Sequence, residues 1–86
     1  MHEMSIALEV CRMTEERVGS AQLAQVTTLG LEVGTDSGIE PDNLEFCLGV
    51  LLTHPPFHGA RGAMTRIGGD VLRLDYIEID DERPRH

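Results

Sequence analysis

Three residues at the start of the sequence, Met1, His2 and Glu3, carry groups that could bind one metal ion. The α-amine of Met1, with the backbone nitrogen and imidazole of His2, could chelate a divalent cation, and the Glu3 carboxylate could add a fourth or an outer ligand. Nitrogen and oxygen donors in a plane suit Ni(II) or Cu(II) better than Zn(II), which prefers a tetrahedron. The alternative is a start methionine and two polar residues at a frayed helix end.

A helix must follow these residues closely if they are to be held in place. From Glu3 to about Val18 apolar residues recur at helical spacing, and Gly19-Ser20 is a typical helix end. Glu9 and Arg12 are spaced to attract each other on the solvent-facing side. The predicted buried stripe consists of Met4, Ala7, Leu8, Cys11, Thr14 and Val18, widened by Ile6, Val10 and Met13.

The middle of the chain predicts a strand and a second helix. Residues Gln25 to Val33 alternate in polarity, which is typical of a half-buried strand. Turn-forming residues follow, and Glu40-Pro41 begins a helix, since proline in the first turn has no N–H to satisfy. The helix ends before His54-Pro55-Pro56, because the residue preceding a proline avoids helical geometry.

The last third predicts two strands, at residues 60–67 and 71–79, with Gly68-Gly69-Asp70 as a hairpin turn between them. Within 71–79, the residues Leu72, Leu74 and Tyr76 share one face and Ile77 and Ile79 take the other. This change of parity suggests a bulge or a strand covered on both sides. Residues 81–86 form a charged tail that we predict to be disordered.

These elements predict an α/β fold in the order α-β-α-β-β. Two helices on one face of a three-stranded sheet would bury the aliphatic stripes, giving a two-layer α+β architecture. With 86 residues in all, the chain is expected to form a single domain over residues 1–80.

Composition narrows the possible functions. The net charge of −8 argues against nucleic acid or an anionic membrane as a partner. Cys11 and Cys47 belong to no C-x-x-C pair and are predicted to be buried free thiols. The sequence has neither a signal-peptide pattern nor an apolar run long enough to span a membrane, so we expect a cytoplasmic protein. No catalytic motif is apparent, and we predict that the chain is not an enzyme.

Three segments of the sequence are together similar to one known family. They are the opening Met1-His2-Glu3-Met4-Ser5-Ile6-Ala7, the segment Leu31 to Pro41, and the strand Leu72 to Ile79. These segments resemble the HypA/HybF family of hydrogenase nickel-incorporation accessory proteins, or metallochaperones. The opening combined with Gly34–Pro41 is specific, whereas either alone would be weak.

The resemblance implies a nickel-binding domain in which Met1 and His2 chelate Ni(II), Glu3 is a further ligand, and Glu40 faces the metal site. Glu40 could equally serve as favourable charge at a helix N-terminus. The implied partners are a HypB-type GTPase and the large subunit of nickel–iron hydrogenase. His54 and His58, in a proline-containing loop, could form a second metal site, but isolated loop histidines are usually only solvated.

The chain departs from the family pattern at one place. Family members carry a zinc domain, with two C-x-x-C pairs, before the last strand, whereas this sequence has only Gly68-Gly69-Asp70 there. We therefore expect a form of the family that lacks the zinc domain and binds no structural zinc. A reduced paralogue or scaffold that docks on the maturation partners without metal transfer is the alternative function.

Chelation by the amine and imidazole predicts a pH-dependent affinity. Metal binding should strengthen as the pH rises through roughly 6 to 8, because both groups must lose a proton before they can ligate. Calorimetric titration with Ni(II) at several pH values measures this. An affinity that stays constant over the range would contradict chelation by the chain start.

Overall fold

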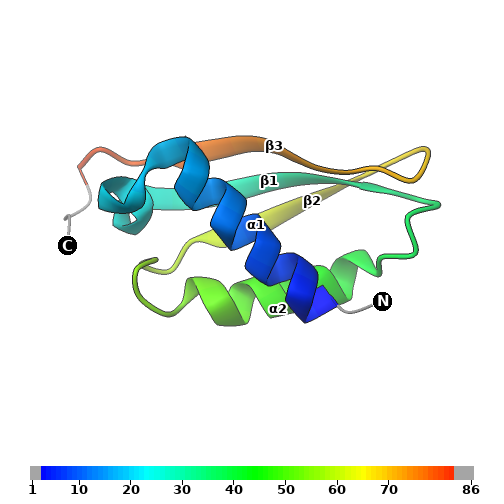
Figure 1. Ribbon diagram of the computed structural model, residues 1–86, viewed down its shortest axis with the longest axis horizontal. Helices are drawn as coiled ribbons and strands as arrows, with labels where there is room; N and C mark the ends of the chain where they lie inside the picture. Colours follow the sequence, from blue (N-terminus) through cyan, green and yellow to red (C-terminus); the bar gives the residue numbers. More distant parts are fainter. Residues whose placement is uncertain (1–2, 83–86) are drawn as a thin grey trace.

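Residues 3–82 of the chain are described by a computed structural model, in which two helices cover one face of a three-stranded sheet (Figure 1). The predicted order α-β-α-β-β and the two-layer architecture are confirmed. One element was not predicted, a short 3₁₀-helix between the first helix and the first strand. The elements are α1 (Glu3–Val18), η1 (Ser20–Gln25), β1 (Val26–Gly34), α2 (Pro41–Leu52), β2 (Arg61–Ile67) and β3 (Leu72–Ile79).

The prediction of a β2–β3 hairpin is wrong, because β1 lies between these two strands in the sheet order β2-β1-β3. Strand β1 pairs with β2 in parallel and with β3 antiparallel. The short connection from β2 to β3 passes over the end of β1 and bonds to it. The amide of Gly34 donates to the Val71 carbonyl at 2.7 Å, and that of Asp36 donates to the Gly69 carbonyl at 2.7 Å.

The change of parity in β3 arises from a β-bulge, which is one of the two explanations that the sequence suggested. Leu74 pairs with Leu31 and Tyr76 with Gly30, so Asp75 is the extra residue. The prediction that Tyr76 shares a face with Leu74 is therefore wrong. The Tyr76 ring lies against Gly30 on the face away from the helices, where it remains 43% exposed.

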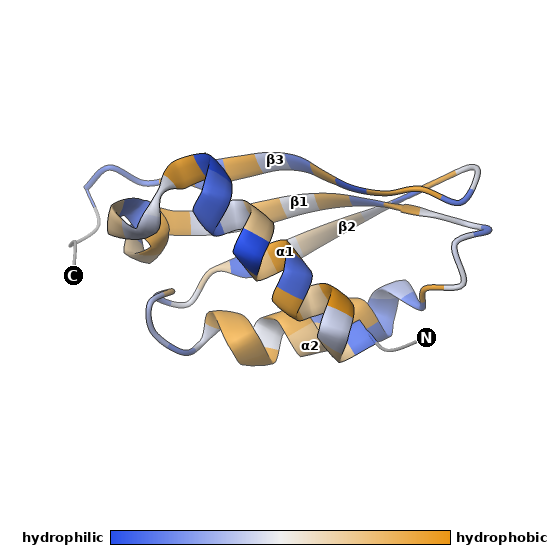
Figure 2. Cartoon of the chain, in the orientation of Figure 1, coloured by the Kyte–Doolittle hydropathy of each residue, from blue (hydrophilic) through white to orange (hydrophobic). Residues whose placement is uncertain are grey.

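The core lies between the helices and the sheet, and Figure 2 shows apolar residues along α2 and the strands. The buried side of α1 differs from the predicted stripe, since Met4 and Leu8 are 41% and 54% exposed. Contact with α2 and the sheet covers a narrower arc of α1, centred on Ala7, Val10 and Thr14. Neither helix within residues 3–82 has the length and apolar character needed to cross a bilayer.

The end of the described chain is bonded to the start of β1. The Asp80 amide donates to the Gln25 carbonyl at 2.9 Å, and the Gln25 side-chain amide donates to the Asp81 carbonyl at 3.2 Å. Asp81 and Glu82 form a turn. The predicted disorder of residues 81–86 concerns mostly residues 83–86, which lie outside the described range.

Gly34 allows a test of how closely the β2–β3 connection approaches the end of β1. A Cβ atom on Gly34 would lie 2.3 Å from the Gly69 carbonyl oxygen, which is backbone and has little freedom to move. Gly34→Ala should therefore lower the free energy of unfolding by at least about 2 kcal/mol, because the connection must shift and lose hydrogen bonds. Urea denaturation measures the change.

Gly49 in α2 provides the matched control. A Cβ there would meet nothing within 4 Å, so Gly49→Ala should be neutral or stabilise by up to about 1 kcal/mol, the helix-propensity difference. Equal effects of the two substitutions would contradict the close approach at Gly34.

Candidate functional site

The carboxylate of Glu3 joins the first turns of the two helices. Its Oε2 accepts a hydrogen bond from the backbone N–H of Glu40 at 3.2 Å, and its Oε1 accepts one from Asn43 Nδ2 at 3.4 Å. Glu3 is only 8% exposed. Glu3 is thereby held beside the N-terminus of α2.

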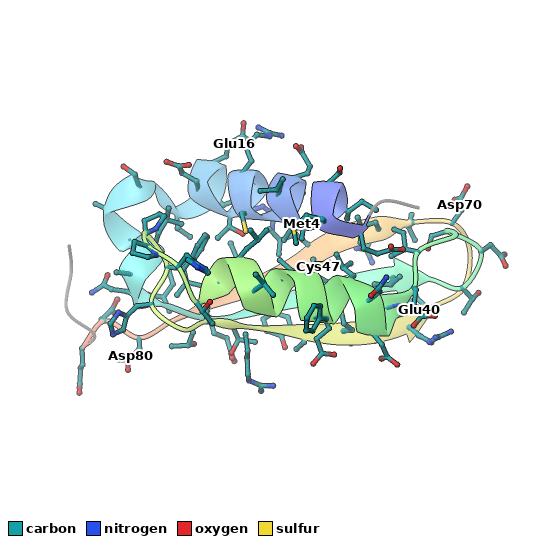
Figure 3. The ribbon with its side chains drawn as sticks, turned by 90° about the horizontal axis from the view of Figure 1, so that it is seen from below. Met4, Glu16, Glu40, Cys47, Asp70 and Asp80 are labelled. Carbon is teal, nitrogen blue, oxygen red and sulfur yellow. The ribbon has the colours of Figure 1, made fainter. Side chains whose placement is uncertain are left out.

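Local sequence explains why α2 presents donors at this point. The first N–H groups of a helix have no partner within the helix. Glu40 is the N-cap residue, and its own side chain accepts from the Asp42 N–H at 3.1 Å, while Pro41 has no N–H to satisfy. The N–H of Glu40 remains for a partner from another element, and Glu3 supplies it. Figure 3 shows Glu40 at the end of α2.

Two carboxylates therefore meet at one helix N-terminus, where the positive end of the helix dipole favours them. The hydrogen bond from the Glu40 backbone holds the pKa of the Glu3 carboxyl below its usual range, and it outweighs the opposing effect of burial. Glu3 is thus a carboxylate at neutral pH. A carboxylate oxygen has two lone pairs, so each Glu3 oxygen keeps capacity for a further ligand.

Of the four predicted site residues, the structure brings Glu3 and Glu40 together. Met1 and His2 lie outside the described residues, so chelation by their nitrogens stays a prediction. Within residues 3–82, no three His, Cys, Asp or Glu side chains gather closely enough to hold a metal ion. Sequence reasoning missed Asn43, which lies one turn after the N-cap Glu40, because its contact with Glu3 depends on tertiary packing.

His54 and the two cysteines singled out in the sequence lie elsewhere. His54 is beyond the C-terminal end of α2, the end opposite Glu40, where its Nδ1 is 2.8 Å from the Val50 carbonyl oxygen. Cys11 and Cys47 are free thiols on α1 and α2, as predicted, but both are half-buried and not buried as expected. Burial raises the pKa of the Cys11 thiol above its ordinary value.

Comparison with known proteins identifies the family. Residues 1–76 match the family model described as HypA, hydrogenase/urease nickel incorporation, metallochaperone. The chain belongs to the HypA family. The match confirms the resemblance drawn from the opening and from the Gly34–Pro41 segment.

Several curated relatives carry the name hydrogenase maturation factor HypA. The protein from Albidiferax ferrireducens is 39% identical over 61 residues, which are 71% of this chain and 54% of that protein. The Geobacter metallireducens protein is 38% identical over 69 residues, 80% of this chain and 60% of its own length. The Paracoccus denitrificans protein is 30% identical over 84 residues, 94% and 74% of the two lengths.

The chain thus spans little more than half the length of the first two of these relatives. Its membership of the HypA family is clear from the match over residues 1–76. What the full-length relatives do as whole proteins is carried over to this chain only as a proposal.

The Glu3 link predicts a pH-dependent stability in metal-free buffer. Because the folded-state pKa of Glu3 is lowered, the ionised carboxylate stabilises the fold above the usual pKa of 4.5, and this contribution is lost as the pH falls through the folded value. Glu3→Gln should therefore melt at a lower temperature than the wild type at pH 7, and the gap should narrow below about pH 4.5. Thermal melts followed by circular dichroism measure it.

Glu15→Gln removes the same charge from the exposed side of α1 and serves as the control. It should leave the melting temperature close to that of the wild type across the pH range. A Glu3→Gln protein as stable as the wild type at pH 7 would show that the link between the two helices contributes nothing.

Proposed function

We propose that this member of the HypA family binds Ni(II) at its chain start and hands it on during hydrogenase maturation. The proposed ligands are the Met1 amine, the His2 backbone nitrogen and imidazole, and Glu3, with Glu40 facing the ion. The observation that supports this most is the pair of hydrogen bonds that fix Glu3 beside Glu40 and Asn43.

Anchoring of Glu3 limits where the preceding donors can be. Two residues of chain span at most about 7 Å, so the backbone nitrogens of Met1 and His2 stay within about that distance of the Glu3 backbone nitrogen. The positive end of the α2 dipole opposes a nearby cation, and the carboxylates of Glu3 and Glu40 offset this effect. A cation with four donors in a plane, such as Ni(II), suits the proposed set of nitrogen and oxygen atoms.

Hand-over requires ligands that can release the ion. A chelate formed by two residues at the start of a chain can open one donor at a time, whereas an enclosed site cannot. Cu(II) would bind the same donors more tightly, so selectivity for nickel has to come from partners and availability in the cell. The proposed partners are a HypB-type GTPase and the hydrogenase large subunit, which places the protein in the cytoplasm.

We further propose that the residues of this chain hold no structural zinc. The sequence contains two cysteines, and these lie singly on α1 and α2. Four thiolate or imidazole ligands in a tetrahedron are typical of structural zinc sites. The connection between β2 and β3 is short and contains no cysteine or histidine.

Two changes at the chain start test the nickel site. His2→Ala removes the imidazole, and a Gly-Ser extension before Met1 converts the amine into an amide. Each should weaken Ni(II) binding at least about tenfold, because each removes a donor that the metal needs, while the circular dichroism spectrum stays unchanged. Calorimetry measures the affinity, and the visible absorption of square-planar Ni(II) reports the geometry.

His54→Ala is the control, since His54 lies at the far end of α2 and should leave the affinity unchanged. If the extended protein binds nickel as well as the original, the site is elsewhere in the chain. If neither protein binds nickel but the metal-free form still captures the GTPase, the scaffold function replaces the carrier function.

A further inference from the structure

Strand β2 is an edge of the sheet, and neither a bulge nor a proline interrupts it. It runs in continuous register with β1 over seven pairs, from Thr28 with Arg61 to Gly34 with Ile67. The opposite edge, β3, is interrupted by two register shifts. Bulges, prolines and covering segments commonly protect edge strands, and β2 contains neither a bulge nor a proline. Figure 1 shows β2 and β3 on either side of β1.

One hydrogen bond shows which backbone groups of β2 point away from β1. The Ile67 carbonyl accepts from the Thr35 amide at 2.8 Å, so Ile67 directs its backbone groups toward the β1 side. Because these directions alternate along a strand, the N–H and C=O groups of Gly62, Met64 and Arg66 face away from β1. In the described part of the chain, these groups have no hydrogen-bond partner from another segment.

The charge of β2 is opposite to that of the molecule. The chain has a net charge of −8, yet β2 carries Arg61 and Arg66 and no acidic residue. Both arginines are exposed, and within residues 3–82 neither forms an ion pair. In contrast, Arg12 and Arg73 are each paired with glutamate.

We propose that the free edge of β2 binds an extended, acidic segment of a partner protein, which adds a fourth strand to the sheet. Main-chain hydrogen bonds to Gly62, Met64 and Arg66 would supply affinity, and the two arginines would select acidic side chains. Arg61 and Arg66 are five residues apart and therefore lie on opposite faces of the sheet. The preferred segment has two acidic residues at the same separation, one on each face.

A second copy of the chain suits the β2 edge less well than an acidic segment does. Pairing of two β2 strands would bring four arginines together, and the two chains would repel each other through a charge of −8 each. An acidic segment instead matches the local charge. The proposal goes beyond nickel binding and does not depend on it, so its test uses the metal-free protein.

The probe is a nine-residue peptide of threonine and valine with glutamates five positions apart. The control peptide has the same composition with glutamates four positions apart, on one face. Amide hydrogen exchange by NMR should slow at Gly62, Met64 and Arg66 when the first peptide is added, and stay unchanged at Ala63 and Thr65, which already face β1. The control peptide should bind at least about threefold more weakly, because only one arginine is then matched.

Two substitutions at one exposed position separate the roles of charge and backbone. Arg66→Ala removes the charge and should weaken peptide binding about threefold, whereas Arg66→Pro also removes an outward N–H and should weaken it about tenfold or more. Proline is tolerated on an edge strand where its N–H faces solvent, and thermal melts establish that each variant folds.

Slowed exchange spread evenly over β2, or equal affinity for the two peptides, would overturn the proposal. So would the absence of binding together with self-association of an Arg61→Thr, Arg66→Thr double variant. That result would mean that the arginines only prevent the edges of two copies from pairing.

Discussion

The contact between the Glu3 carboxylate and the first turn of α2 connects the start of α1 to the second helix. It satisfies the N–H of Glu40, which the helix itself leaves without a partner, and it draws a charged side chain into a largely buried position. Such a side chain remains charged only where donors surround it, and the lowered pKa of Glu3 reflects this. The two helix N-termini are consequently held together.

The sheet supplies a second constraint, because β1 is its central strand. Leu29, Leu31 and Val33 are almost fully buried beneath the helices, while the opposite face carries Gly30 with the Tyr76 ring against it. Placing β1 between β2 and β3 forces the short β2–β3 connection to cross the end of β1. Gly34 makes this possible, since it has no Cβ to meet the Gly69 carbonyl.

Much of the fold could be predicted from local pattern, because helical spacing and polarity alternation report on which face of an element is buried. The identity of strand neighbours could not, since Gly68-Gly69-Asp70 has hairpin chemistry whether or not the flanking strands pair. The exposure of Met4 and Leu8 was also missed, because apolar spacing marks a wide stripe and the contact with α2 covers only part of it.

In the candidate site, too, some features could be predicted from the sequence and others could not. Residues 1–3 are recognisable as possible ligands from their atoms and adjacency, and Glu40 as a helix N-cap from the proline that follows it. Nothing local indicates that Glu3 bonds to a backbone amide 37 positions along the chain, because that contact is made by tertiary packing. For the same reason, Asn43 can be assigned to the site only from the structure.

The same carboxylate thus has a structural role and a proposed metal-binding role, and the two share lone pairs. A cation bound to Glu3 would withdraw electron density from the oxygens that accept from Glu40 and Asn43, so metal binding and helix packing are thermodynamically linked. The link is reciprocal. If a bound metal ion changed the affinity for a partner that alters the packing of α1 on α2, the partner would change the metal affinity by the same factor. In the proposed carrier, release of the ion would not require the fold to open. Under this proposal, a shift at the α1–α2 contact on docking would change the affinity of Glu3 for the cation.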